Sequence, residues 1–345
     1  MSIEYRKLGN SGAIVTKFCL GTMTFGAESD EATSHNLLDD YAQAGGNFID
    51  TADVYSTGVS ETIVGKWLKG HPTEARQMVV ASKARFPMGP GPNDIGISRR
   101  HLSEALEASL RRLGLQQLDL YQMHAWDALT PIEETLRFLD DAISGGKIAY
   151  YGFSNFLGWH VAKASELAKA RGFAPPATLQ PQYSLLVREI EFEIVPACLD
   201  AGIGLLPWSP LGGGWLSGKY KRDVPPTGAT RLGENPNRGM EAYAPRNAQE
   251  RTWTIIDAVE RIAKARGVSL AQVALAWVAA QPAVTSVILG ARNPEQLADN
   301  LAAAALALSS DEIATLSAVS SPLVGDYPYG QGGTAQRHRK MAGGR

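Results

Sequence analysis

Eight short apolar runs, separated by longer segments of helical period, recur along this chain of 345 residues. Each run is bounded by Gly, Pro or polar residues, which is typical of strands buried on both faces in a parallel sheet. The runs lie at 18–21, 47–50, 78–82, 118–123, 148–154, 177–180, 204–208 and 286–290. This rhythm restricts the chain to folds in which strands and helices alternate.

The segments between the runs have the residue spacing of helices. In 98–113, leucines recur at intervals of four, four and three residues, and Gly114 stops the pattern. Further helices are predicted at 31–44, 131–144, 156–171, 190–201, 251–266, 270–280 and 294–305.

Eight strand–helix units in one chain of this length favour an α/β fold of the (β/α)8 TIM barrel type over a doubly wound open sheet. The turn residues Asn10-Ser11-Gly12, between two short runs, predict an N-terminal β-hairpin on the floor of the barrel. We expect residues 1–345 to form a single domain with extra helices and loops. Within it, 211–250 is predicted to be a long mobile loop and about 322–345 a flexible tail.

The composition excludes two classes of partner. Net charge is -2 at pH 7 and the pI is near 6.3, so the chain has no electrostatic footprint for nucleic acid or an anionic membrane. We therefore expect a small-molecule or protein partner. Two cysteines, no apolar N-terminal segment and no apolar run of about 18 residues predict a cytoplasmic protein. The sequence assigns no oligomeric state.

Polar residues follow the predicted strands at the point where each strand ends. In a barrel, all these strand ends converge on one face, where such barrels keep their active sites. Residues far apart in the sequence would therefore share one mouth, namely Asp50, Tyr55, Lys83, His124, Ser154, Asn155, Gln180, Trp208, Ser209, Gly290, Ala291 and Arg292.

Four of these residues combine into a site for carbonyl chemistry. Taken alone, Asp50 could cap a turn, Tyr55 could pack, Lys83 could lie on the surface and His124 could be a core histidine. A tyrosine with a pKa of about 10 is a poor proton donor near neutrality, but a nearby ammonium favours its phenolate. A carboxylate would keep the lysine charged, and a neutral histidine could orient a carbonyl oxygen.

Two other groups of polar residues receive simpler interpretations. Asp53, in the stretch F-I-D-T-A-D-V-Y at 48–55, is interpreted as ordinary loop polarity. The remaining histidines show no metal-ligand spacing and no H-E-x-x-H occurs, so we predict no metal.

Nine stretches carry the resemblance to a known family. They are L-G-N-S-G (8–12), G-T-M-T-F-G (21–26), F-I-D-T-A-D-V-Y (48–55), V-V-A-S-K (79–83), L-D-L-Y-Q-M-H (118–124), G-K-I-A-Y-Y-G-F-S-N-F (146–156), L-Q-P-Q-Y-S-L-L (179–186), P-W-S-P-L-G-G-G-W-L-S-G-K-Y (207–220) and G-A-R-N-P-E-Q-L-A-D-N-L (290–301). Through these motifs, roughly residues 3–320 resemble the aldo-keto reductases, NAD(P)H-dependent (β/α)8-barrel oxidoreductases.

The resemblance implies a catalytic tetrad of Asp50, Tyr55, Lys83 and His124, and NADPH or NADP as cofactor, with NADH as an alternative. It places the nicotinamide carboxamide on Ser154, Asn155 and Gln180, the ring on Trp208 and the 2′-phosphate on Arg292. Where some relatives have a second arginine, this chain has Gln296, which weakens the preference for NADP. The implied cofactor-binding residues are Gly21, Thr22, Met23, Asp50, Ser154, Asn155, Gln180, Trp208, Ser209, Pro210, Leu211, Gly213, Lys219, Gly290, Ala291, Arg292, Gln296 and Asn300.

Two functions are consistent with this resemblance. The first is an NADPH-dependent reductase that converts aldehydes or ketones to alcohols, with Tyr55 as general acid. The second is a cofactor-binding, redox-sensing partner module like the potassium-channel β subunits, with little turnover. The substrate itself is not specified, although a largely apolar pocket is expected with walls from Met23, Phe25, Phe86, Trp126 and Trp215.

Overall fold

A parallel eight-stranded sheet forms the centre of the computed structural model, which describes residues 3–228, 230–330 and 333. Its strand order is β10-β3-β4-β5-β6-β7-β8-β9, and a parallel bridge from Leu205 to Val284 closes it into a barrel. The predicted (β/α)8 barrel is therefore confirmed. Its strands are β3 (Phe18–Gly21), β4 (Phe48–Asp50), β5 (Val79–Ala84), β6 (Leu118–Met123), β7 (Ile148–Ser154), β8 (Thr178–Gln180), β9 (Gly204–Leu205) and β10 (Val287–Gly290).

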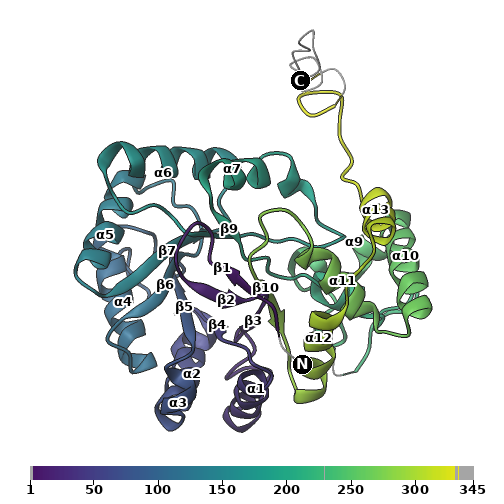
Figure 1. The fold of residues 1–345 in the computed structure, drawn as a ribbon, viewed down its shortest axis with the longest axis horizontal. Coiled ribbons are helices and arrows are strands. Elements are labelled where there is room, and N and C mark those ends of the chain that lie inside the picture. Colours follow the sequence, from purple (N-terminus) through teal and green to yellow (C-terminus); the bar gives the residue numbers. More distant parts are fainter. Residues whose placement is uncertain (1–2, 229, 331–332, 334–345) are drawn as a thin grey trace.

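Helices surround the outside of this sheet (Figure 1). Each predicted helix occurs within a few residues of its expected bounds, whereas α2, α3 and α13 were not expected. None of the helices in the described part of the chain is long and apolar enough to cross a membrane. They are α1 (Glu31–Gln43), α2 (Val59–Gly70), α3 (Pro72–Ala75), α4 (Arg99–Leu113), α5 (Ile132–Ser144), α6 (Gly158–Arg171), α7 (Ile194–Ala201), α10 (Glu250–Arg266), α11 (Leu270–Ala279), α12 (Pro294–Ala302) and α13 (Ser310–Val319), with 3-10 turns η2 (Glu189–Glu191) and η5 (Ala303–Ala305).

The N-terminal hairpin covers one end of the barrel. Strands β1 (Tyr5–Lys7) and β2 (Ile14–Thr16) pair antiparallel, as predicted, and cross the sheet in Figure 1. Leu8 and Val15 of the hairpin are fully buried in one cluster with Phe48 and Leu120 of the barrel strands. The hairpin thus fills the floor of the barrel with apolar side chains and leaves the opposite mouth for a site.

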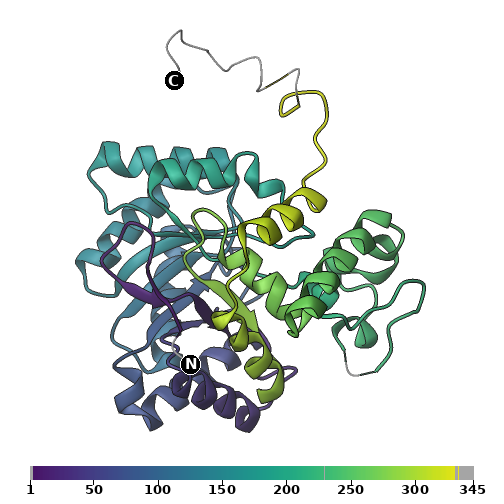
Figure 2. The same ribbon diagram turned by 45° about the vertical axis from the view of Figure 1, so that its right-hand side comes forward.

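The segment 211–250, predicted as one long mobile loop, carries short helical elements. These are η3 (Gly212–Ser217), α8 (Arg231–Glu234), η4 (Gly239–Glu241) and α9 (Tyr243–Asn247), which lie beside α10 in Figure 2. Trp215 is fully buried and stacks on Tyr243, with ring centroids 5.4 Å apart. This aromatic contact fixes a segment whose Gly and Pro content suggested an unstructured loop. The predicted tail at about 322–345 lies partly outside the described residues.

Candidate active site

A cavity of about 640 Å³ opens at the carboxyl ends of the barrel strands. Every residue predicted to bind the cofactor lines it, as do Tyr55 and His124. The parallel arrangement explains this convergence, because each strand delivers its following loop to the same mouth. Residues separated by most of the sequence, from Gly21 to Asn300, therefore face one space.

Lys83 lies at the centre of the polar network beneath this cavity. Its side chain is fully buried on β5, and its ammonium has three acceptors. Nζ lies 2.5 Å from Oδ1 of Asp50, 2.9 Å from the carbonyl oxygen of Thr51 and 3.0 Å from the hydroxyl oxygen of Tyr55. Because every ammonium proton has a partner, the charge is held in one orientation.

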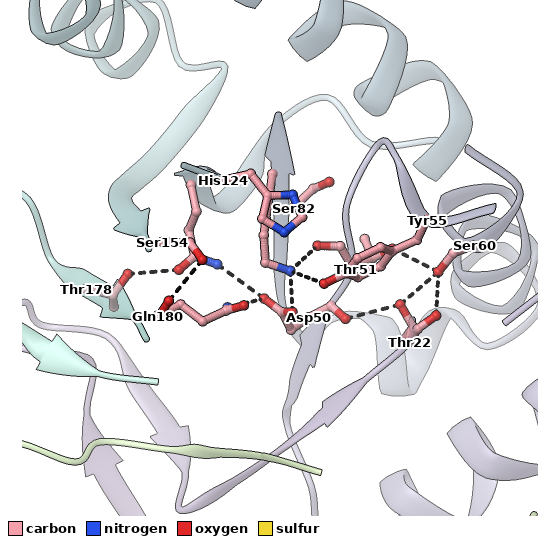
Figure 3. A network of polar contacts seen from close by, with 12 residues as sticks. Thr22, Asp50, Thr51, Tyr55, Ser60, Ser82, His124, Ser154, Thr178 and Gln180 are labelled. Atoms are coloured by element: carbon pink, nitrogen blue, oxygen red, sulfur yellow. Dashed lines mark hydrogen bonds and ion pairs between the residues drawn. The ribbon is translucent and has the colours of Figure 1, made fainter. Parts of the chain in front are cut away.

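The Asp50 carboxylate is bound on both of its oxygens. Oδ2 accepts hydrogen bonds from Nε2 of Gln180 at 2.9 Å and from Nε2 of Gln122 at 3.2 Å. Figure 3 shows Thr51 and Tyr55 on one side of Asp50 and Gln180 on the other. Gln122 was not predicted to belong to the site. The sequence did contain a signal for it, because Gln122 lies on β6, the strand that His124 follows.

The electrostatics of the pair keep Lys83 charged. Burial disfavours the ammonium, but Asp50 and Tyr55 more than offset it and raise the pKa of Lys83 above its ordinary value. For Tyr55, burial raises the pKa of the phenol, and the Lys83 ammonium counteracts only part of that rise. Tyr55 is therefore protonated at neutral pH.

The turn that presents Tyr55 has unusual backbone geometry. The 3-10 turn η1 (Tyr55–Gly58) contains Ser56 at φ 48° and Thr57 at φ 52°, both in the left-handed region. Residues other than glycine rarely adopt this conformation, which costs about 1–3 kcal/mol at each position. The surrounding contacts compensate, including a hydrogen bond of 3.0 Å from Ser56 Oγ to the carbonyl oxygen of Phe25.

His124 lies beside Tyr55 at the end of β6. The ring centroids of the two residues are 5.8 Å apart, and the Phe86 ring lies 4.8 Å from that of His124. Burial, together with the positive charges of Lys83 and Arg85, lowers the pKa of His124 well below its ordinary value. The imidazole is consequently neutral at physiological pH.

Asn155 connects His124 to Trp208. Its Nδ2 donates to the carbonyl oxygen of His124 at 2.9 Å, and its Oδ1 accepts from Nε1 of Trp208 at 3.1 Å. Asn155 has φ 56°, a conformation that asparagine tolerates better than most residues. These bonds hold the indole of Trp208 at the cavity wall.

Acidic residues occupy the opposite end of the cavity, which sequence reasoning did not anticipate. Glu241 accepts a hydrogen bond from Ser209, and Glu234 pairs with both terminal nitrogens of Arg292 at 3.0 Å. Arg231 also lines this region. The carboxylates come from a Gly- and Pro-rich segment without periodicity, so no local pattern placed them there.

The interpretation of Asp53 as an ordinary polar loop residue is wrong. Its side chain is fully buried, and neither carboxylate oxygen has a hydrogen-bond partner among the described residues. Burial, followed by the charge of Glu61, raises the pKa of Asp53 to about 7. Arg112, which bonds Glu61 at 2.7 Å, offsets only part of this effect.

The predicted substrate walls are correct only in part. Met23 and Phe86 line the cavity. Phe25 and Trp215 are fully buried in the core. Trp126 does not line the cavity but stacks on the ring of His160, with centroids 3.9 Å apart. Within the described ranges, no three His, Cys, Asp or Glu side chains are arranged to hold a metal ion.

Comparison with known proteins defines the class of this chain. The model of the aldo/keto reductase family matches residues 17–321. The chain therefore belongs to the aldo/keto reductase family.

Three relatives show the range of proteins that the chain resembles. It is 36% identical to the "Uncharacterized oxidoreductase YrpG" of Bacillus subtilis, over 94% of this chain and 98% of that protein. It is 34% identical to the versiconal hemiacetal acetate reductase of Aspergillus parasiticus, over 90% of this chain and 95% of the relative. It is also 36% identical to the "Probable voltage-gated potassium channel subunit beta" of Oryza sativa subsp. japonica, over 87% of this chain and 91% of that protein. The chain is thus similar both to oxidoreductases and to proteins named as channel subunits.

Proposed function

We propose that this chain is an NADPH-dependent reductase of aldehydes and ketones in which Tyr55 is the general acid. The observation that carries the proposal is the triple hydrogen bonding of the Lys83 ammonium to Asp50, Thr51 and Tyr55. This arrangement combines a proton donor with a fixed positive charge beside it, which a carbonyl oxygen requires when it becomes an alkoxide.

Tyr55 can supply the proton without a change in the network. Its oxygen accepts a hydrogen bond from Lys83, so its own O–H proton is available to a substrate in the cavity. When that proton leaves, the ammonium 3.0 Å away stabilises the phenolate. Asp50, bound to Lys83, prevents the ammonium from losing its charge.

His124 acts as a neutral hydrogen-bond donor in this proposal. Because its pKa lies well below the ordinary value, it does not compete with Tyr55 as a charged acid. A neutral imidazole beside the phenol can donate to the same carbonyl oxygen and orient it. Met23, Phe86 and Trp208 supply the apolar remainder of the wall.

The residues of the cavity fit a nicotinamide dinucleotide phosphate. Ser209 and Arg292 already bind carboxylates, which shows that their donors suit oxyanions. Asn155 and Trp208 would hold the nicotinamide, Ser209 the pyrophosphate and Arg292 the 2′-phosphate. When bound, the reduced nicotinamide supplies the hydride that the carbonyl carbon receives.

A second candidate function rests on the similarity to proteins named as potassium-channel β subunits. In that function the chain binds cofactor and a protein partner and turns over little. A screen of aldehydes, ketones and sugars with NADPH and with NADH separates the two candidates. Many turnovers per molecule with at least one carbonyl compound support the reductase. A single turnover followed by slow cofactor release contradicts it and supports the partner module.

A further inference from the structure

Arg292 is held between two carboxylates at the adenosine end of the cavity. Its Nη1 and Nη2 lie 3.0 Å from Oε1 and Oε2 of Glu234, in a two-pronged pair. Nη2 also lies 3.4 Å from Oε1 of Glu28, which in turn lies 2.9 Å from Nη1 of Arg238. The guanidinium that would bind a 2′-phosphate is therefore already occupied by an acid of the same chain.

Glu241 occupies the neighbouring position in the same way. Its carboxylate accepts from Oγ of Ser209 and lies 3.4 Å from Nε2 of Gln182 and 3.9 Å from Nη1 of Arg231. The carboxylate also lies against Gly213, where an added Cβ would overlap it, and Gly213 has φ 68°. Glu241 thus covers the Ser209–Gly213 turn, which would receive a pyrophosphate.

Both acids come from one short segment. Glu234 ends α8 and Glu241 ends η4, so residues 230–241 carry both acids. Glu241 lines the cavity itself, and Glu234 pairs with Arg292, which lines it. A carboxylate and a phosphate present similar pairs of charged oxygen acceptors to a guanidinium or a hydroxyl. The two acids therefore use the donors that the cofactor's two phosphate positions would use.

We propose that Glu234 and Glu241 compete with the cofactor for these donors, Glu234 with the 2′-phosphate and Glu241 with the pyrophosphate. The inference rests on the proposed function, because it assumes that a nicotinamide dinucleotide enters this cavity. Glu234 is then a residue that determines the discrimination between NADPH and NADH, and Glu241 sets the affinity for both.

The two positions lead to different expectations. NADH has the pyrophosphate but lacks the 2′-phosphate, so it leaves the Glu234–Arg292 pair intact. NADPH must break that pair, and its 2′-phosphate then lies beside the negative charge of the Glu234 carboxylate. Removal of the charge at Glu234 therefore favours NADPH alone, whereas removal of the charge at Glu241 favours both cofactors.

Isothermal titration of the purified full chain with NADPH and with NADH, at low ionic strength, tests this prediction. We expect Glu234→Gln to tighten NADPH binding by up to about fivefold, the upper end of the range for a partly exposed ion pair, and to leave NADH unchanged. We expect Glu241→Gln to tighten both by a similar factor. Glu295→Gln is the matched control, since this exposed residue lies close in sequence to Arg292 and its side chain has no ion pair in the described structure.

Each outcome decides the matter. Tighter NADPH binding in Glu234→Gln, with NADH and the control unchanged, supports the inference. Equal effects of Glu234→Gln on both cofactors, weaker NADPH binding, or no change in either variant overturns it. If the wild-type chain binds neither cofactor, the proposed function itself fails, which is a different result from normal binding that the variants do not alter.

Discussion

Nζ of Lys83 lies 3.0 Å from the hydroxyl oxygen of Tyr55, although the two residues are 28 positions apart in the sequence. Lys83 reaches Tyr55 from inside the barrel, where its side chain is fully buried. This relationship makes the phenol the acceptor of a charged donor and leaves its proton facing the cavity.

The buried pair of Lys83 and Asp50 determines stability as well as chemistry. Lys83→Met leaves the Asp50 carboxylate buried without its charged partner, which costs about 3–5 kcal/mol. We expect urea unfolding to show a loss of this size in Lys83→Met. In the double variant Lys83→Met with Asp50→Asn, most of this stability returns, while carbonyl reduction stays at least about 100-fold below wild type. Equal losses in the single and double variants would contradict the pairing.

His124 provides a prediction about protonation. Its lowered pKa means that the unfolded chain, with an ordinary histidine pKa of about 6.5, takes up the proton first as the pH falls. This contribution to stability is full above about pH 6.5 and decreases as the pH drops below it. In an NMR titration of the folded protein, we expect the His124 ring to remain neutral at pH 6.5, where a histidine in an unfolded peptide is half protonated. Half protonation of the His124 ring near pH 6.5 would refute the proposed neutral donor.

Asp53 provides a prediction of the opposite sign. Its carboxyl has a pKa of about 7 in the folded chain against an ordinary value of 3.8, so the folded state binds the proton more tightly. The contribution of Asp53 to the stability of the wild-type chain should therefore decrease as the pH rises from about 4 to about 7, by at most about 4 kcal/mol. Asp53→Asn removes this dependence, and we expect it to be more stable than wild type by about 2–4 kcal/mol at pH 8.

The control for Asp53 is Asp40→Asn, because Asp40 is exposed at the surface of α1. Urea unfolding of both variants at pH 5 and pH 8 measures the difference. If Asp53→Asn and Asp40→Asn show the same dependence on pH as wild type, Asp53 does not retain its proton in the folded state.

The barrel could be predicted because its signals are local. Apolar runs such as 118–123 are strands on sequence grounds alone, since a strand buried on both faces needs no alternation. Helix α2 was missed because Gly65 lies inside it and its N-cap is Gly58, in a left-handed conformation without a side-chain cap. Helix α13 did carry a signal, the capping box of Ser309 and Glu312.

The sequence predicted the end of the candidate site around Tyr55 but not the acidic contacts at the end around Arg292. Tyr55, Lys83 and His124 follow strands, so the barrel rule placed them together. Glu234 and Arg292 are 58 positions apart, and Glu28 and Arg292 are 264 apart, with nothing in the local sequence to connect them. The burial of Asp53 likewise depends on packing between α2, α4 and the barrel. Such contacts follow from tertiary structure rather than from spacing.

The most direct test of the proposed function is the replacement Tyr55→Phe, which removes one hydroxyl and retains the ring. We expect carbonyl reduction to fall by about 100- to 10,000-fold, because the general acid is lost, while the dissociation constant for NADPH stays that of wild type. Tyr121→Phe is the matched control, since Tyr121 is fully buried and its hydroxyl has no partner among the described residues; it should reduce carbonyl compounds at the wild-type rate. Turnover of Tyr55→Phe near the wild-type rate, with NADPH bound normally, would contradict the central role of Tyr55.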